Sequence, residues 1–269
     1  MKPICEIPGI LKKILIKKKQ ELSRDIQRIP PGEMQSMSAK TTGQRALSDI
    51  LSKPGPQGMN IIAEIKRASP SRGAINMNLD PAKTAEAYYD GGACSISVLT
   101  EVDHFLGDPR FIRQVKDTVP LPVLRKDFIF DPYQLYQSRY LGADGVLLIT
   151  AILKEETLRE LITLCHSLEM NPLVEVHNKD EMEIAGRCGA RLVGINNRNL
   201  ADFQVNLETT LNLALVKENQ MILVSESGFH CRADLLKVKN AGVYNFLIGE
   251  NLASSRDPAD RLKQLLGRS

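Results

Sequence analysis

The chain has 269 residues, 43% of them hydrophobic, and a formal net charge of +3 at pH 7. Such a chain can bury one sizeable core, and its small net charge gives no indication of a nucleic-acid or membrane partner. Five cysteines without a C-x-x-C pair argue against a disulfide framework or a thiolate zinc site, and no run has the length of a membrane span or the pattern of a signal peptide. We therefore expect a soluble, cytoplasmic protein that holds no metal.

Residues 1–48 are expected to form a helical extension that packs on a second domain, residues 49–269. Apolar residues recur in the extension at helical spacing, and a Pro-Pro-Gly run at 30–32 ends the pattern. The apolar residues are Ile10, Leu11, Ile14 and Leu15, and the lysines among them are Lys12, Lys13, Lys17, Lys18 and Lys19. Because no aromatic residues interleave for base stacking, we interpret the lysines as the solvated face of a helix that lies against the second domain and can help to close its site.

Eight short apolar runs bounded by turn signals follow in the second domain, as is typical of buried parallel strands. The first begins at Ile61, and the others cover 95–99, 122–124, 145–149, 172–176, 191–195, 221–224 and 244–248.

Segments of helix length separate these runs. Several open with Asp followed by Pro, which suits a helix N-cap and the first helical position. The pairs are Asp80-Pro81, Asp108-Pro109, Asp131-Pro132 and Asp257-Pro258. Eight strand–helix units predict a (β/α)8 TIM barrel. A doubly wound open sheet is the alternative, but no run is followed by Gly-x-Gly-x-x-Gly.

Charged and polar residues stand at the carboxyl ends of the runs, which in a barrel project into one mouth. They are Glu64 and Lys66, then Arg125, Lys126 and Asp127, then Glu175, then Asn196, Asn197 and Arg198, then Ser225, Glu226 and Ser227, and finally Glu250. Gly228 and Gly249 follow the last two runs, where barrels commonly bind phosphate on backbone amides. The pattern indicates acid–base chemistry on an anionic small molecule.

Five motifs at successive strand ends make the chain similar to the indole-3-glycerol-phosphate synthase family. They are IIAEIKRASPS at 61–71, LRKDF at 124–128, LVEVH at 173–177, GINNRNL at 194–200 and SESG at 225–228, and the resemblance runs from Ile61 to about Leu252. It implies a lyase of tryptophan biosynthesis that acts on 1-(2-carboxyphenylamino)-1-deoxyribulose 5-phosphate. The indole ring is closed with loss of carbon dioxide and water, and no metal or organic cofactor is required.

The resemblance also implies roles for the strand-end residues. Lys126 protonates the C2 carbonyl oxygen during ring closure, and Lys66 binds an anionic group or serves as the acid of a later step; which lysine acts at which step stays open. Glu175 is the base of the dehydration, and Glu64 holds the lysines. We expect the two facing ammonium groups to lower the pKa of whichever lysine acts.

The remaining implied roles concern substrate binding. Asn196 and Glu226 bond the ribulose hydroxyls, while Ser69 and Arg198 meet the carboxylate. Phe128 packs on the anthranilate ring. The phosphate group is bound by Lys66, Ser227, Gly228 and Gly249.

Three residues need a separate interpretation. Glu250 stands where the family often has Ser, and we expect its carboxylate to turn away from the phosphate site. Asp108 also replaces a frequent Ser, and we expect it to cap the following helix. His177 lies one alternation beyond Glu175 and is interpreted as a loop residue without a catalytic role.

The sequence leaves two alternatives to the lyase. Phosphoribosylanthranilate isomerase, a related barrel, needs a Cys and an Asp at the ends of strands one and six, where this chain has Glu64 with Lys66 and Asn196 with Arg198. A silent partner subunit that binds a phosphorylated ligand and docks through the basic helix is the other, and the complete charged strand ends speak against it. We expect a monomer or weak homodimer.

Overall fold

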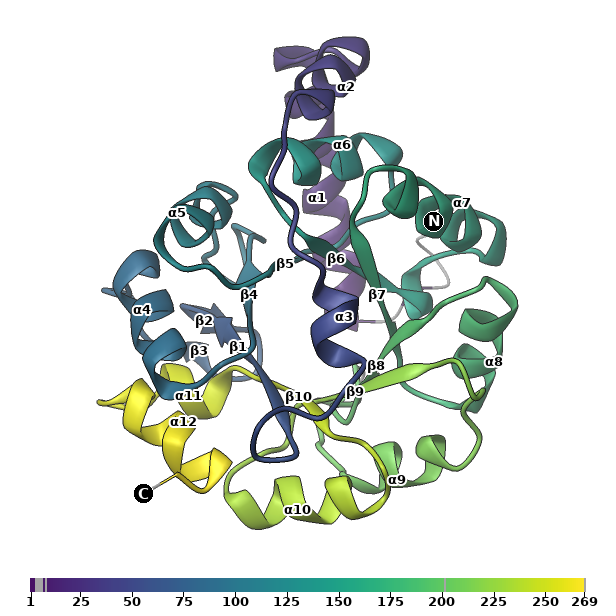
Figure 1. Cartoon of the computed structure of the whole chain (residues 1–269). Helices are drawn as coiled ribbons and strands as arrows, with labels where there is room; N and C mark the ends of the chain where they lie inside the picture. Colours follow the sequence, from purple (N-terminus) through teal and green to yellow (C-terminus); the bar gives the residue numbers. More distant parts are fainter. Residues whose placement is uncertain (3–6, 8, 201, 269) are drawn as a thin grey trace.

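A closed barrel of eight parallel strands forms the centre of the molecule, with helices around it (Figure 1). The computed structural model describes residues 1–2, 7, 9–200 and 202–268. Around the barrel the strands follow the order β1, β4, β5, β6, β7, β8, β9 and β10, and β10 pairs with β1. The predicted (β/α)8 TIM barrel is confirmed.

The barrel strands lie close to the predicted apolar runs. They are β1 (Asn60–Ile65), β4 (Ser95–Leu99), β5 (Val123–Lys126), β6 (Gly145–Ile149), β7 (Asn171–Val176), β8 (Leu192–Asn196), β9 (Ile222–Glu226) and β10 (Asn245–Ile248). The outer helices are α4 (Pro81–Gly91), α5 (Arg110–Thr118), α6 (Pro132–Leu141), α7 (Glu155–Ser167), α8 (Lys179–Arg187), α9 (Glu208–Ala214), α10 (Arg232–Asn240) and α12 (Pro258–Leu266). Shorter elements at the barrel mouth are the hairpin of β2 (Ala68–Ser69) and β3 (Gly73–Ala74), the 3-10 turn η2 (Thr150–Ile152) and α11 (Glu250–Ala253).

Three of the four Asp-Pro pairs begin helices as predicted. The carboxylates of Asp80, Asp131 and Asp257 each accept a backbone N–H of the first turn. The fourth helix, α5, has Pro109 rather than Asp108 at its N-cap. Asp108 still accepts the amide N–H of Arg110 at 2.8 Å, but its carboxylate also pairs with the Arg110 guanidinium, so its expected capping role holds only in part.

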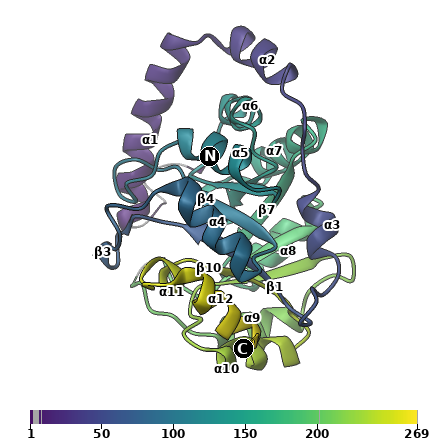
Figure 2. The ribbon, with the colours of Figure 1, turned by 60° about the vertical axis from the view of Figure 1, so that its left-hand side comes forward.

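The N-terminal segment reaches both ends of the barrel. It consists of α1 (Gly9–Arg28), α2 (Pro31–Ala39) and α3 (Leu47–Leu51), and Figure 2 shows α1 and α3 on opposite sides of the strands. At the amino-terminal end, Asn245 at the start of β10 donates to the carbonyl of Leu51. At the carboxyl end, α1 lies over the mouth. The domain boundary expected after residue 48 falls inside α3 and stays a prediction.

The interpretation of the lysines of α1 as one solvated face is wrong for Lys18. Lys12, Lys13, Lys17 and Lys19 are exposed. Lys18 is only 3% exposed, because its ammonium group reaches Asp127 at the end of β5. No helix within residues 9–200 and 202–268 is long and apolar enough to cross a membrane.

Candidate active site

A cavity of about 690 Å³ opens at the carboxyl end of the barrel. Its size is that of a typical small-molecule site. All the predicted site residues except Glu226 line it: Glu64, Lys66, Ser69, Lys126, Phe128, Glu175, Asn196, Arg198, Ser227, Gly228 and Gly249. Helix α1 contributes Ile10, Leu11 and Ile14 to the wall, so the N-terminal segment is part of the site.

Two lysines and two glutamates form a connected group at the floor. Lys126 Nζ lies 2.8 Å from Glu226 Oε2 and 3.2 Å from Glu64 Oε2. Lys66 Nζ lies 2.7 Å from the other oxygen of Glu64, Oε1. Glu226 is completely buried behind Lys126, which explains why it does not line the cavity. Glu64 therefore joins the two ammonium groups.

The barrel register brings these strand ends to similar heights. Lys126 on β5 is level with Leu99 on β4, and Glu175 on β7 is level with Ile149 on β6. Asn196 on β8 is directly opposite Glu226 on β9. Residues from strands far apart in the chain thus converge because the strands end at one edge of a closed sheet.

The electrostatics of the lysines differ from the prediction. Burial lowers the pKa of Lys126, but the carboxylates of Glu226, Glu64 and Glu175 outweigh it and raise the pKa above its ordinary value. The expected lowering by a neighbouring ammonium is therefore wrong for Lys126. Burial raises the pKa of Glu64, yet the two lysines lower it to about 2. Lys126 and Glu64 are both ionised at neutral pH.

Glu226 behaves in the opposite way. Burial and the nearby Glu175 carboxylate raise its pKa, against the lowering effect of Lys126, to about 7. Its Oε1 atom accepts no hydrogen bond from any residue that the structure describes. Glu226 can thus be present with or without its proton near neutral pH.

Glu175 contacts a histidine that sequence reasoning set aside. His177 Nε2 lies 3.4 Å from Glu175 Oε1, and His177 Nδ1 lies 3.0 Å from Glu181 Oε2. Burial raises the pKa of Glu175, but the nearby His177, together with Lys126 and Asn196, lowers it overall. The i, i+2 spacing of an extended segment puts Glu175 and His177 on one side, and this signal could have revealed the contact.

Some strand-end residues point away from the mouth. Arg125 is fully buried and donates to Thr100, Gln137 and Ser138, between the barrel and α6. Asn197 is also buried and donates to Ser225 Oγ at 3.0 Å. These side chains hold strands and helices together instead of forming the site.

The backbone at the predicted phosphate site turns sharply and lies close to neighbouring groups. Ser227 and Gly228 both have positive φ values, 68° and 90°, which turn the chain sharply after β9. A Cβ atom at Gly249 would collide with the Glu64 carboxylate, so only glycine fits there. The turn and the close approach leave backbone near the N-terminus of α11 accessible to an anion.

Contrary to the expectation, the Glu250 carboxylate does not turn away from the site. Its Oε1 lies 2.7 Å from Arg72 Nε, and its Oε2 lies 3.2 Å from Arg198 Nη2. It lines the cavity together with both arginines. The Glu250 carboxylate is therefore paired with the Arg198 guanidinium, which is predicted to bind the substrate carboxylate.

An apolar wall stands opposite these charges. Phe128 is 8% exposed, and its ring centroid lies 6.2 Å from that of Phe105. Ile10, Leu11 and Ile14 of α1 add aliphatic surface to the cavity. The wall suits a flat aromatic group. Ser69 is buried at the rim, with its hydroxyl 3.3 Å from that of Ser71.

Comparisons with known proteins give one consistent result. A family model described as indole-3-glycerol phosphate synthase matches residues 11–265. Indole-3-glycerol phosphate synthase of Carboxydothermus hydrogenoformans is 43% identical over 261 residues, 95% of this chain and 99% of that protein. The protein of the same name from Desulfosudis oleivorans is 42% identical over 258 residues, 96% of this chain and 98% of that one.

Solved structures at low identity share the fold. A 3-hexulose-6-phosphate synthase superimposes with a TM-score of 0.61 at 17% identity, covering 78% of this chain and 99% of that one. The N-acetylmannosamine-6-phosphate 2-epimerase from Clostridium perfringens gives a TM-score of 0.59 at 13% identity, over 84% and 99% of the chains. At these identities the likeness supports the barrel and no more.

Proposed function

Because the chain belongs to the indole-3-glycerol phosphate synthase family, a family of carboxy-lyases in tryptophan biosynthesis, we propose that the residues at its barrel mouth close the indole ring of 1-(2-carboxyphenylamino)-1-deoxyribulose 5-phosphate. The observation that carries the proposal is the pair of lysines on one carboxylate. Lys66 and Lys126 lie 2.7 and 3.2 Å from the two oxygens of Glu64. This arrangement places two proton donors in one cavity with a separate buried base, Glu175.

Lys126 is the proposed acid of ring closure. The aromatic carbon that bears the carboxylate forms a bond to the C2 carbonyl carbon, and the carbonyl oxygen takes a proton from Lys126 Nζ. The carboxylates of Glu64 and Glu226 support this role, because they keep Lys126 protonated before the substrate reacts. Carbon dioxide then leaves, and its bonding electron pair restores the aromatic ring.

Glu175 is the proposed base of the dehydration. The C2 hydroxyl leaves as water after protonation by Lys66, or by Lys126 once it has regained a proton from solvent, and Glu175 takes the proton whose loss forms the new double bond. The contact between Glu175 and His177 supports this role. A cationic imidazole beside a fully buried carboxylate keeps that carboxylate ionised and able to accept a proton.

The substrate's anionic groups would lie on the opposite rim. The amides of Gly228 and Gly249, with Ser227 and Lys66, would bind the phosphate, and Arg198 with Ser69 would bind the carboxylate. Asn196 and Glu226 would bond the ribulose hydroxyls. The anthranilate ring would pack on Phe128. Binding of the anion displaces Glu250 from Arg198, since one guanidinium edge cannot serve both carboxylates.

The isomerase alternative is disfavoured by the same strand ends. That reaction needs a thiol and a carboxyl group facing each other from strands one and six. Here β1 ends in Glu64, with Lys66 just beyond it, and β8 ends in Asn196. Cys94 lies just before the start of β4, toward the amino-terminal end of the barrel, and burial raises the pKa of its thiol to about 12.

We also propose that the protein works in the cytoplasm as a monomer or weak homodimer. Eleven of the twelve predicted site residues already line one cavity within a single chain, which supports a site formed by one subunit. The cysteines within the described residues, at 94, 165, 188 and 231, are all free. Light scattering across a tenfold range of protein concentration would measure the oligomeric state, and a stable higher oligomer would contradict this proposal.

The residue roles are tested by turnover of two variants. Lys126→Ala and Glu175→Gln should each lower turnover by about 100-fold or more, the usual effect of removing an acid or base. Lys12→Ala, which changes an exposed lysine of α1, is the matched control and should keep normal turnover. Circular dichroism would establish that all variants are folded. Near-normal rates in both site variants would refute the assigned roles.

A further inference from the structure

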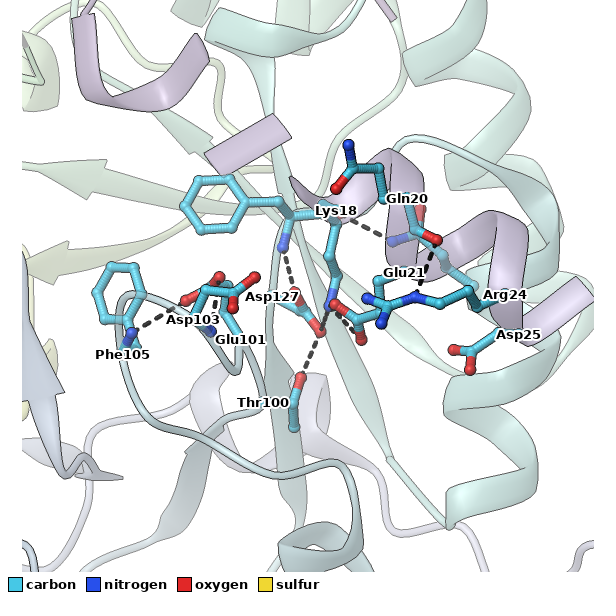
Figure 3. A network of polar contacts seen from close by, with 12 residues as sticks. Lys18, Gln20, Glu21, Arg24, Asp25, Thr100, Glu101, Asp103, Phe105 and Asp127 are labelled. Carbon is cyan, nitrogen blue, oxygen red and sulfur yellow. Dashed lines mark hydrogen bonds and ion pairs between the residues drawn. The ribbon is translucent and has the colours of Figure 1, made fainter. Parts of the chain in front are cut away.

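Lys18 is the one lysine of α1 that the structure buries. It follows Ile14 and Leu15 on the apolar stripe of the helix, and its side chain points toward the end of β5 (Figure 3). Lys18 Nζ lies 2.8 Å from Asp127 Oδ2 and 3.0 Å from Glu21 Oε2. The ammonium group is thus enclosed between a barrel strand end and its own helix.

Asp127 occupies the position between two residues of the site. Lys126, Asp127 and Phe128 all contribute to the cavity wall, and the Asp127 side chain itself is fully buried. Asp127 Oδ2 accepts from Thr100 Oγ1 at 2.5 Å and from Arg125 at 2.9 Å. Its other oxygen accepts the backbone N–H of Phe128 at 2.8 Å. Any shift of this carboxylate is therefore passed to the backbone that carries Lys126 and Phe128.

We infer that Lys18 is a positioning residue, whose ion pair with Asp127 couples the placement of α1 over the mouth to the placement of the Lys126 ammonium and the Phe128 ring. This inference rests on the role proposed above for Lys126. Leu11, Ile14 and Leu15 of α1 are buried as well, so the helix has apolar contacts besides the ion pair. A buried ion pair adds little net stability compared with an apolar contact of the same shape, but it fixes two elements at one distance.

The charges around Asp127 are balanced only when Lys18 is present. Two cations, Lys18 and Arg125, face two carboxylates, Asp127 and Glu21. Without Lys18, the Asp127 carboxylate keeps Arg125 and Thr100 as partners, so the strand end remains attached to the barrel. What is lost is the connection to the helix that covers the substrate.

The test compares Lys18→Met with Lys17→Met, which removes an exposed lysine from the same turn. Lys18→Met should lower kcat by about 10- to 100-fold with a smaller change in KM, because a misplaced acid affects the transition state more than substrate binding. Lys17→Met should match the unmodified protein. Lys18→Arg keeps the positive charge and should recover part of the lost kcat. Glu21→Gln leaves the Lys18–Asp127 pair intact and should keep kcat within about twofold.

Hydrogen exchange gives a readout that does not need catalysis. The amide of Phe128 donates to Asp127, so peptides that contain it should exchange faster in Lys18→Met and not in Lys17→Met. Unchanged kcat and exchange in folded Lys18→Met would overturn the inference. If Lys18→Met does not fold, Lys18→Gln, which also removes the charge, takes its place, and unchanged kcat and exchange in folded Lys18→Gln would overturn the inference instead. The unmodified protein could also make no indole product while Lys18→Met still exchanges faster. That result would refute the proposed function and leave the coupling intact.

Discussion

Replacing Lys126 with Met removes the only ion-pair partner that Glu226 has among the described residues. The Glu226 side chain is completely buried, and its second oxygen has no hydrogen-bond partner within the part of the chain that is described. Glu64 is less affected because Lys66 stays 2.7 Å away. The substitution therefore leaves one buried carboxylate without compensation and keeps a side chain of similar shape.

The expected loss of stability is large and depends on pH. Breaking a buried ion pair by removing one partner costs about 3–5 kcal/mol. Burial already raises the pKa of Glu226 from 4.5 to about 7, and losing the Lys126 ammonium raises it further. A folded state that binds this proton more tightly than the unfolded state loses stability as pH rises from 4.5 through the folded pKa. The difference in free energy of unfolding between Lys126→Met and the unmodified protein should thus grow by about 1 kcal/mol between about pH 6 and about pH 8, at roughly 1.4 kcal/mol per pKa unit.

Urea unfolding followed by circular dichroism at both pH values measures this directly. The double variant Lys126→Met with Glu226→Gln removes both charges and should recover most of the lost stability while turnover stays at least about 100-fold low. Lys12→Met is the exposed-lysine control. Equal stability of Lys126→Met and the unmodified protein at about pH 8, or a double variant less stable than the single one, would refute the electrostatic reasoning.

Two further variants test the groups around this cluster. Glu250→Ser frees Arg198 from a partly exposed pair and should lower KM about threefold to fivefold at constant ionic strength with kcat unchanged, an effect of up to about 1 kcal/mol; a higher KM would show that Glu250 helps to bind substrate. His177→Asn should lower the free energy of unfolding by a few kcal/mol at about pH 6, at roughly 1.4 kcal/mol per pKa unit. Burial lowers the pKa of His177, but the carboxylates of Glu175 and Glu181 raise it to about 10, so this stabilisation is complete below 6.5 and is lost as pH rises through about 10. The free energies of unfolding of His177→Asn and the unmodified protein, measured by denaturant unfolding across that range, should converge at high pH. A difference that stays constant would contradict the pairing of His177 with the two carboxylates.

Much of the site followed from the periodicity of the strands. Apolar runs of strand length located the barrel strands, and side chains at their carboxyl ends had to meet at one mouth. Glu64, Lys126 and Glu175 do so, and all lie inside the barrel end. Alternation along an extended segment also separates Lys126, which faces the cavity, from Arg125, which faces α6.

The remaining features depend on contacts between distant segments. The orientation of Glu250 is set by Arg72 from the β2–β3 hairpin and by Arg198 after β8, neither of which is near it in the chain. The pKa of Lys126 is set by three carboxylates from other strands. The prediction from sequence considered only the second lysine and not these carboxylates.

The burial of Lys18 did leave a signal in the sequence. It lies four residues after Ile14 and three after Leu15, so it falls on the apolar stripe of α1. A basic residue on such a stripe needs a buried acid, and the partner, Asp127, lies 109 positions further along the chain. Composition alone puts the five lysines in one group and so does not separate Lys18 from the exposed ones.

Product formation tests the central claim most directly. The purified, metal-free protein is mixed with 1-(2-carboxyphenylamino)-1-deoxyribulose 5-phosphate in the presence of a chelator, and fluorescence is followed with excitation in the indole band. The chain contains no Trp, so new emission reports the indole product. The proposed chemistry predicts a steady rise that is lost in Lys126→Ala, whereas no rise from a folded protein that is still protected against heat by the ligand would show a binding protein without this activity.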